Sequence, residues 1–95
     1  MKVVFSTEAL QEVQEAQRYY EDEVEGLGKA FVETLHAAIQ KMKRAPEISR
    51  IIKKPYRRYL IQRFPYGIIY RVEDDTIYVV AIAHLKRRPY YWKNR

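Results

Sequence analysis

The chain contains no cysteine, only two histidines and only three glycines among its 95 residues. Without cysteine it can form neither disulfides nor thiolate metal sites. The histidines, His36 and His84, lie far apart and have no second imidazole or thiol at ligand spacing, so we predict no metal and expect no cofactor. A glycine-rich phosphate loop is also excluded, because the segment 26–28 lies between two predicted helices rather than after a strand.

Long apolar runs are absent as well. No stretch approaches the length that crosses a bilayer, and Met1–Phe5 lacks the apolar run of a signal peptide. We therefore expect no membrane association and a cytoplasmic location. Ser6 and Ser49 have no plausible base and orienting carboxylate, so a hydrolase triad is not predicted either.

The chain does contain enough apolar residues for one core, and its charge is strongly uneven. Hydrophobic residues make up 47% of the sequence, and we assign residues 1–95 to a single domain. Residues 1–47 carry six Lys and Arg against nine Asp and Glu, whereas residues 48–95 carry twelve against three. The resulting charges of −3 and +9 sum to the overall +6. This asymmetry indicates a polyanionic or acidic partner for the second half.

The first half has the periodicities of one strand followed by two helices. The apolar, β-branched segment Lys2–Phe5 predicts a strand. Ser6 or Thr7 can cap the next helix, whose apolar stripe is Leu10, Val13, Ala16, Tyr20, Val24 and Leu27. Its other face is acidic, with Glu12, Glu15, Glu21, Asp22, Glu23 and Glu25. Gly26 and Gly28 suit a helix stop and a tight turn. The second helix has the stripe Phe31, Leu35, Ala38, Ile39 and Met42 and ends before Pro46, so the two helices form an antiparallel hairpin.

After a connection over residues 47–55, the pattern changes to that of strands. Arg57–Phe64, Tyr66–Val72 and Thr76–Ala83 are rich in Tyr, Ile and Val and are separated by turn residues. Short connections make these strands antiparallel neighbours. We therefore predict an α+β fold in the order β-α-α-β-β-β. Its N-terminal strand and helical hairpin pack on one face of a small twisted, mainly antiparallel sheet.

Basic residues of the second half are candidates for binding a target or a polyanion. Strand alternation predicts that Arg57 and Arg63 share one side of their strand and that Arg71 shares a side with Ile69. By the same rule His84 shares a side with Tyr78, Val80 and Ile82. The face without helices would then be a concave basic surface, although Arg71 opposite an acid would be an ordinary cross-strand pair. The nine candidates are Lys53, Lys54, Arg57, Arg58, Arg63, Arg71, Lys86, Arg87 and Arg88.

The last twelve residues, 84–95, combine five Lys and Arg with three consecutive aromatic residues and no acid. Cations and flat rings suit nucleic acid, which offers phosphates and bases. The alternative is that the aromatic residues fold back over a sheet edge, which we expect for Trp92. The segment directly follows the apolar run 77–83, so we expect a rigid strand to fix the position and direction of its start.

Four motifs follow one another along the chain: Tyr19-Tyr20, Leu27–Phe31, Phe64–Val72 and Ile82–Trp92. In their order and spacing they resemble the RelE/ParE toxin superfamily of bacterial type II toxin–antitoxin modules, which includes plasmid stabilisation proteins. The resemblance implies a growth-inhibiting toxin that a co-expressed antitoxin neutralises within a hetero-oligomer. We expect that antitoxin to be acidic and partly disordered when free. RelE-like members cut mRNA in the ribosomal A site, whereas ParE-like members inhibit DNA gyrase and are not nucleases.

The residues of the RelE-like nucleases carry over only in part. Arg87 matches the family's arginine after the last strand and Arg58 one of its sheet lysines. Leu60 occupies the second lysine position, and Gly67 the position of another arginine. His84 and Tyr90 or Tyr91 could replace the acid and base, so an endoribonuclease would use Arg58, His84, Arg87 and Tyr91.

The incomplete set favours the ParE-like branch, because losing one preorganised cation commonly costs about a hundredfold in rate. Gyrase inhibition by protein binding is therefore the first hypothesis. Ribosome-dependent mRNA cleavage is the second and a non-toxic binding module is the third, so enzymatic activity stays an open question with a leaning against it.

Overall fold

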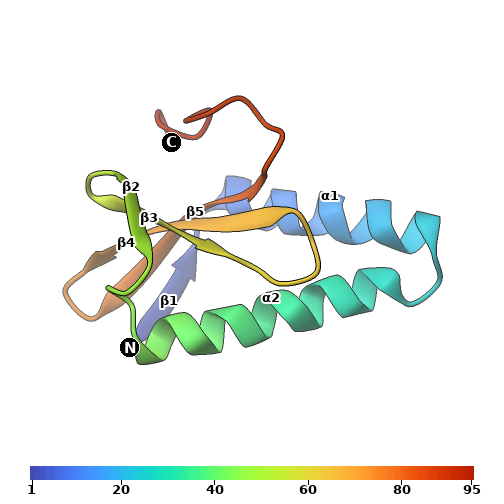
Figure 1. The fold of residues 1–95 in the computed structure, drawn as a ribbon, viewed down its shortest axis with the longest axis horizontal. Coiled ribbons are helices and arrows are strands. Elements are labelled where there is room, and N and C mark those ends of the chain that lie inside the picture. The colour runs from blue at the N-terminus through green and yellow to red at the C-terminus, as the bar shows by residue number, and fades with distance from the viewer.

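The structure is a computed structural model that describes residues 1–95. Its elements are β1 (Lys2–Phe5), α1 (Thr7–Glu23), α2 (Leu27–Arg44), β2 (Arg50–Lys53), β3 (Tyr56–Leu60), β4 (Tyr66–Glu73) and β5 (Thr76–His84). The strands form one sheet in the order β1-β5-β4-β3-β2, and the helices pack against one of its faces (Figure 1). β1 runs parallel to β5 and all other pairs are antiparallel. The predicted α+β fold is confirmed, with one strand more than predicted.

The helical hairpin forms, but the predicted stripe of the first helix is only partly right, because Leu10 and Val24 are exposed and Leu27 begins α2. The Ser6 hydroxyl accepts a hydrogen bond from the Ala9 amide at 3.0 Å, which caps α1 at the predicted residue. The connection is shorter than predicted, because Gly26 in the left-handed region (φ 87°) leads directly into α2. Gly28 therefore lies inside the first turn of α2, where a Cβ atom would be 2.6 Å from the carbonyl oxygen of Gln17. Neither helix is both long and apolar enough to cross a bilayer.

One residue of the predicted acidic face fastens the hairpin. The Glu21 carboxylate accepts hydrogen bonds from the amides of Gly26 at 2.9 Å and Gly28 at 3.0 Å. These amides belong to the start of α2, where helix N–H groups have no partner within the helix. Glu21 therefore caps α2 from α1, and it is not a freely solvated acid.

The strands of the second half differ from the prediction at two places. β2, Arg50–Lys53, lies inside the predicted connection. It was not predicted because four residues with charged ends carry too little apolar pattern to be recognised as a strand without their partner strand. β3 ends at Leu60 rather than Phe64. Beyond it Arg63 has a φ of 72°, and both Ile61 and Phe64 are buried. Two buried residues three apart cannot belong to one alternating strand face, so the chain leaves the sheet here.

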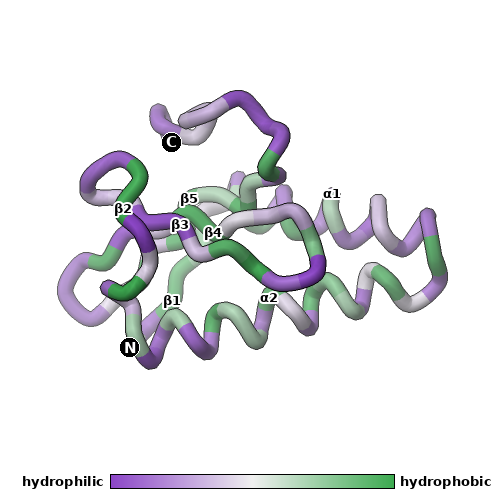
Figure 2. Tube along the Cα trace, viewed as in Figure 1, coloured by the Kyte–Doolittle hydropathy of each residue, from purple (hydrophilic) through white to green (hydrophobic).

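The main core lies between the sheet and the helices. It joins residues of α2, β4 and β5 such as Phe31, Ile68 and Ile82. Phe31, Phe64, Tyr20 and Tyr66 form an aromatic group whose ring centroids lie 4.8–6.3 Å apart. Figure 2 shows that the C-terminal segment is largely hydrophilic.

A β-bulge in β5 changes which residues share a face. The register with β4 passes from Ala81 opposite Ile69 to Val79 opposite Tyr70, which leaves Val80 as the extra residue. Val80 and Ala81 both belong to a second cluster on the opposite side of the sheet from the helices, which we call the open face. Ile82 belongs to the core on the helix side. The prediction that His84 shares a face with Tyr78 and Val80 is therefore wrong, because the bulge reverses the alternation.

Candidate functional site

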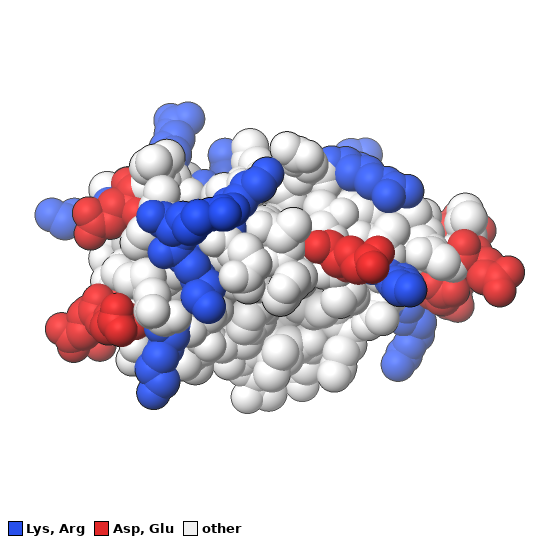
Figure 3. All heavy atoms as spheres, turned by 90° about the horizontal axis from the view of Figure 1, so that it is seen from below, with Lys and Arg blue, Asp and Glu red and all other residues white.

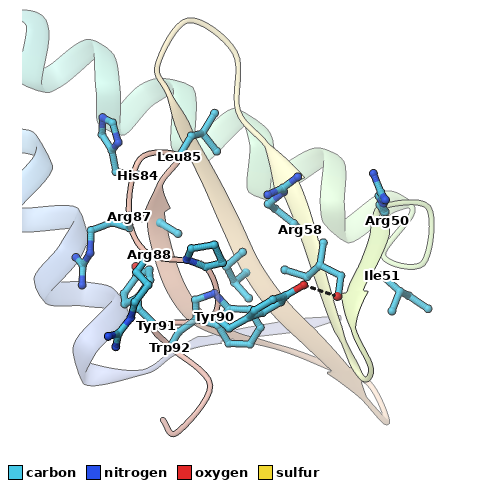
Figure 4. Close-up of a pocket in the computed structure, with 14 residues that line it drawn as sticks. Arg50, Ile51, Arg58, His84, Leu85, Arg87, Arg88, Tyr90, Tyr91 and Trp92 are labelled. Carbon is cyan, nitrogen blue, oxygen red and sulfur yellow. Dashed lines mark hydrogen bonds between the residues drawn. The ribbon is translucent and has the colours of Figure 1, made fainter.

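The tail, residues 85–95, folds back over the open face and forms one wall of a groove. The groove has a volume of about 290 Å³ and lies between the tail and the strands β2 to β5 (Figure 4). Trp92 is only 4% exposed and packs with Ile69, Val80, Ala81 and Ala83, so the expected structural role of Trp92 is confirmed. The groove lining contains Arg50, Ile51, Ile52, Arg58, Ile69, Ala83, His84, Leu85, Arg87, Arg88, Pro89, Tyr90, Tyr91 and Trp92.

Arg58 and Arg50 lie on the strand side of the groove. They are directly opposite each other in the pairing of β3 with β2. The stem of Arg58 crosses Gly67, since a Cβ atom at Gly67 would be 2.9 Å from the Cγ of Arg58. Neither guanidinium forms a salt bridge or a hydrogen bond within the protein. The strand side of the groove therefore presents two uncompensated cations.

Glu12 of α1 holds the tail on the other side. Its carboxylate accepts hydrogen bonds from the Tyr91 hydroxyl at 2.6 Å and from both terminal nitrogens of Arg95 at 2.8 and 3.0 Å. It also accepts from the amide of Ile82 at 2.9 Å, and Arg95 donates to the carbonyl oxygen of Val80 at 3.0 Å. β1 pairs with β5 only as far as Val79, so Glu12 and Arg95 satisfy the β5 edge where β1 no longer covers it.

Tyr91 is the link between this anchor and the basic end of the tail. The guanidinium carbon of Arg87 lies 3.8 Å from the centroid of the Tyr91 ring, a stacked arrangement of a cation on an aromatic face. Burial, and then the hydrogen bond to Glu12, raise the pKa of Tyr91 well above its usual value. The phenol therefore stays protonated at neutral pH, and its proton is engaged by Glu12.

His84 points away from the groove floor towards α1. Its ring lies edge-on to Tyr66 with centroids 5.0 Å apart, and its Nδ1 accepts a hydrogen bond from the amide of Lys86 at 3.0 Å. In the neutral ring the proton is thus on Nε2. Together with Tyr19, Tyr20, Tyr66 and Glu15, His84 lines a second cleft of about 420 Å³ beside α1. Burial raises the pKa values of Tyr66 and Tyr20 there.

The comparisons with known proteins agree with the fold. The profile of the family described as "ParE toxin of type II toxin-antitoxin system, parDE" matches residues 3–89. The chain belongs to the ParE toxin family. A solved structure from a chromosomal ParDE toxin–antitoxin system of P. aeruginosa has the same fold, with a TM-score of 0.68 and 13% identity. The match covers 90% of this chain and 97% of that one. A search of curated protein sequences finds no relative.

In this ParE family member the four candidate nuclease residues line one groove but do not converge on one point. Arg58 stands on the strand side, and Arg87 stands with Tyr91 on the tail side (Figure 4). The Tyr91 hydroxyl is bound to Glu12, and the His84 ring packs on Tyr66. Gly67 leaves the space that Arg58 occupies, so an arginine at that position would displace Arg58.

The other basic candidates of the toxin fall into different environments. Arg57 faces the helix side, where its Nη1 donates to the carbonyl oxygens of Glu47 at 2.7 Å and Ser49 at 2.8 Å. Arg63 lies in a loop over the Phe64 ring, so the prediction that it shares a strand face with Arg57 is wrong, because β3 ends before it. Arg71 does lie on the side of Ile69, but it packs on Tyr78 and lies 4.0 Å from Glu73.

The remaining lysines and arginines of the prediction are exposed. Lys53 lies over the Tyr90 ring, whose hydroxyl donates to the carbonyl oxygen of Ile52 at 3.3 Å and so ties the tail to β2. Arg88 lines the groove, whereas Lys54 and Lys86 do not. The predicted basic surface on the open face is therefore narrower than expected, and its core is Arg58, Arg87 and Arg88.

Sequence reasoning missed Arg50 and Glu12. Arg50 was hidden because its strand was not recognised. The position of Glu12 could have been predicted from its spacing, because it lies three residues after Ala9 and four before Ala16, the two buried residues of α1. That spacing places Glu12 on the buried side of the helix. A carboxylate there needs donors, and the basic tail was the obvious source.

Proposed function

We propose that this ParE family toxin inhibits growth by binding DNA gyrase and that a cognate antitoxin neutralises it. The observation that carries the proposal is the state of Tyr91: its hydroxyl is fixed on Glu12 at 2.6 Å and its ring is covered by Arg87. A nuclease would need these two side chains free to face a phosphate. A protein-binding toxin needs only a rigid surface, which the anchored tail supplies.

The test is gyrase supercoiling by purified components. We expect the toxin to block supercoiling and Arg87→Ala to weaken the block, because Arg87 is an exposed cation on the tail. Arg63→Ala is the matched control, since Arg63 is an exposed arginine outside the groove. Full supercoiling at saturating toxin would remove the gyrase proposal.

A ribosome-dependent mRNA endonuclease is the second candidate, and one observation favours it. Arg58, His84, Arg87 and Tyr91 all line the same groove, so a rearrangement of the tail on the ribosome would bring them to one substrate. Primer extension on a translated message would then reveal cleavage within codons. If Arg87→Ala leaves cleavage and toxicity unchanged, this assignment fails.

The proposed antitoxin is an acidic chain that is partly disordered when free. The basic second half supports an acidic partner. Figure 3 also shows an uncharged area between groups of charged side chains on the side seen from below, where a partner could make contacts other than ion pairs. We expect toxin and antitoxin to form a hetero-oligomer and their affinity to fall as the salt concentration rises. Binding that is unchanged at high salt would argue against an electrostatic contribution to this interface. Failure to slow growth when expressed alone would instead favour a non-toxic binding module.

A further inference from the structure

We infer that Arg50 and Arg58 together bind a carboxylate of an acidic, partly apolar segment of a partner protein, seated in the groove under the tail. The inference rests on the proposed function only for the identity of that partner, since the antitoxin is the chain expected to carry such a segment. The residues concerned are the arginine pair, Arg50 and Arg58, and the apolar groove residues on the same face, Ile52, Ile69 and Leu85.

The pairing of the two arginines is the first argument. Arg50 and Arg58 are direct cross-strand neighbours of β2 and β3. Side chains at directly opposed positions project to the same face, and like charges placed so are destabilising. The sheet nonetheless carries this pair with no acid to offset the repulsion. An anion bound in the groove would offset that repulsion.

The second argument is the absence of acids around the groove. Among its fourteen lining residues are four arginines and no Asp or Glu. The three acids of the second half, Glu73, Asp74 and Asp75, lie at the turn between β4 and β5, at the opposite end of these strands from the tail. No side chain of the protein competes for the pair.

The third argument is that Gly67 leaves room for the stem of Arg58 on the open face. Gly67 stands in the neighbouring strand, paired with Leu60, and the Arg58 stem crosses it. Any larger residue would push the stem away, since a Cβ atom at Gly67 would be 2.9 Å from Cγ and 3.0 Å from Cδ.

The apolar surroundings favour a peptide over nucleic acid. Leu85 is 50% exposed and lines the groove on the tail side, and Ile52 lines it beside Arg50, whereas the Ile51 side chain points to the other face of the sheet with its partner Arg57. Trp92 is buried and offers no free face for a base to stack on, whereas Tyr90 is 42% exposed and has Lys53 over its ring. Exposed aliphatic side chains next to cations match a segment in which acidic and apolar residues alternate.

Trp92 provides the measurement, because it is the single tryptophan and it lines the groove. The probe is a short synthetic peptide in which glutamate alternates with leucine, added to the full chain while Trp92 emission and peptide anisotropy are followed. A peptide with glutamine in place of glutamate and a single-stranded RNA of equal net charge are the comparison ligands. The variants are Arg50→Gln, Arg58→Gln and Arg58→Lys, and Arg63→Gln is the control outside the groove.

We expect the acidic peptide to bind, and the glutamine peptide to bind markedly less. Arg50→Gln and Arg58→Gln should each weaken binding about tenfold, which is the value of one charge-assisted hydrogen bond. The peptide affinity of Arg58→Lys should lie between those of the native protein and of Arg58→Gln, because lysine keeps the charge but cannot form a bidentate hydrogen bond. Arg63→Gln should change nothing.

Three results would overturn the inference. One is equal weakening by Arg63→Gln, which would mean diffuse attraction. Another is RNA that binds with the same dependence on Arg50 and Arg58 while the peptide does not. The last is that the acidic peptide does not bind at all. If one arginine variant fails to fold, the other arginine variant and the glutamine peptide still test the inference. Supercoiling measured on the same samples separates the proposals, because peptide binding without gyrase inhibition refutes only the proposed target.

Discussion

Removing the charge of Glu12 should reveal how much of the stability depends on the anchored tail. Glu12→Gln keeps the size of the side chain and removes one acceptor oxygen. In the native protein the two oxygens accept four hydrogen bonds, from Ile82, Tyr91 and twice from Arg95. The side chains of Glu12 and Arg95 are 11% and 19% exposed, so water replaces these bonds poorly.

The expected loss in the free energy of unfolding follows from the buried groups that lose their hydrogen-bond partner. Breaking a buried ion pair by removing one member costs about 3–5 kcal/mol. Arg95 lies at the chain end and can turn into solvent, which relieves part of that cost, so we expect a loss of about 2–4 kcal/mol in the free energy of unfolding. For a domain of this size that corresponds to a fall in Tm on the order of 15 °C.

The tail should nevertheless stay on the sheet. Burying a tryptophan removes about 150–250 Å² from water, which at about 25 cal/mol per Å² stabilises by roughly 4–6 kcal/mol as an upper bound. This exceeds the expected loss at Glu12. The Trp92 emission of Glu12→Gln should therefore remain that of a buried indole, while the amide of Ile82 exchanges faster.

Urea unfolding followed by Trp92 fluorescence measures the change, with Glu15→Gln as the matched control. Glu15 lies one turn further along α1, is exposed and has no ion-pair partner, so its loss should stay within about 0.5 kcal/mol. The reasoning is refuted if the two variants unfold alike. A double-mutant cycle with Arg95→Gln should return a coupling of about 1–3 kcal/mol.

Three further predictions concern pH and the glycines. Tyr91, Tyr66, Tyr70 and Tyr20 have pKa values raised above 10.0 by burial first, so the stability that they contribute is fully present below pH 10 and is lost as pH rises through the folded-state values. Unfolding followed from pH 8 to 12 should show this decline, and Tyr91→Phe should make it shallower; an unchanged slope would contradict the role of Tyr91. Gly28→Ala should cost about 1–2 kcal/mol in thermal denaturation, because overpacking against the rigid Gln17 carbonyl outweighs the gain of about 1 kcal/mol in helix propensity. Gly67→Ala should cost less than about 1 kcal/mol, because the flexible stem of Arg58 can move, yet it should weaken peptide binding in the groove; a large loss of stability with unchanged binding would speak against the proposed placement of Arg58.

Much of the fold was predictable because it depends on local patterns. The α1 cap at Ser6 and the apolar stripe of α2 follow from spacings within a few residues, and the helical hairpin follows from them. The β4 and β5 strands were found because each has eight or nine residues of strong strand composition. The burial of Trp92 was also foreseen, since a large ring after an apolar strand has the sheet within reach.

The candidate site was predictable only in its composition. The basic tail, Arg58 and Arg87 were recognised from charge and from the family motifs. The sheet face predicted for His84 was wrong, because one extra residue, Val80, reverses the alternation of side chains along β5. Such a bulge depends on the pairing of β5 with β4 and not on the sequence of β5 alone. β2 was missed for a related reason, since its short segment becomes a strand through β3.

By itself, then, the sequence determined the order of every element except β2, the position of the basic tail and the family. Those properties come from periodicity and composition, which act over a few residues. The tertiary structure alone decided that Glu12 meets Tyr91 and Arg95, more than seventy-five residues away in the chain, and that Arg50 faces Arg58. Such contacts depend on register and on hydrogen bonds that must be satisfied where β1 ends, and no local pattern encodes them.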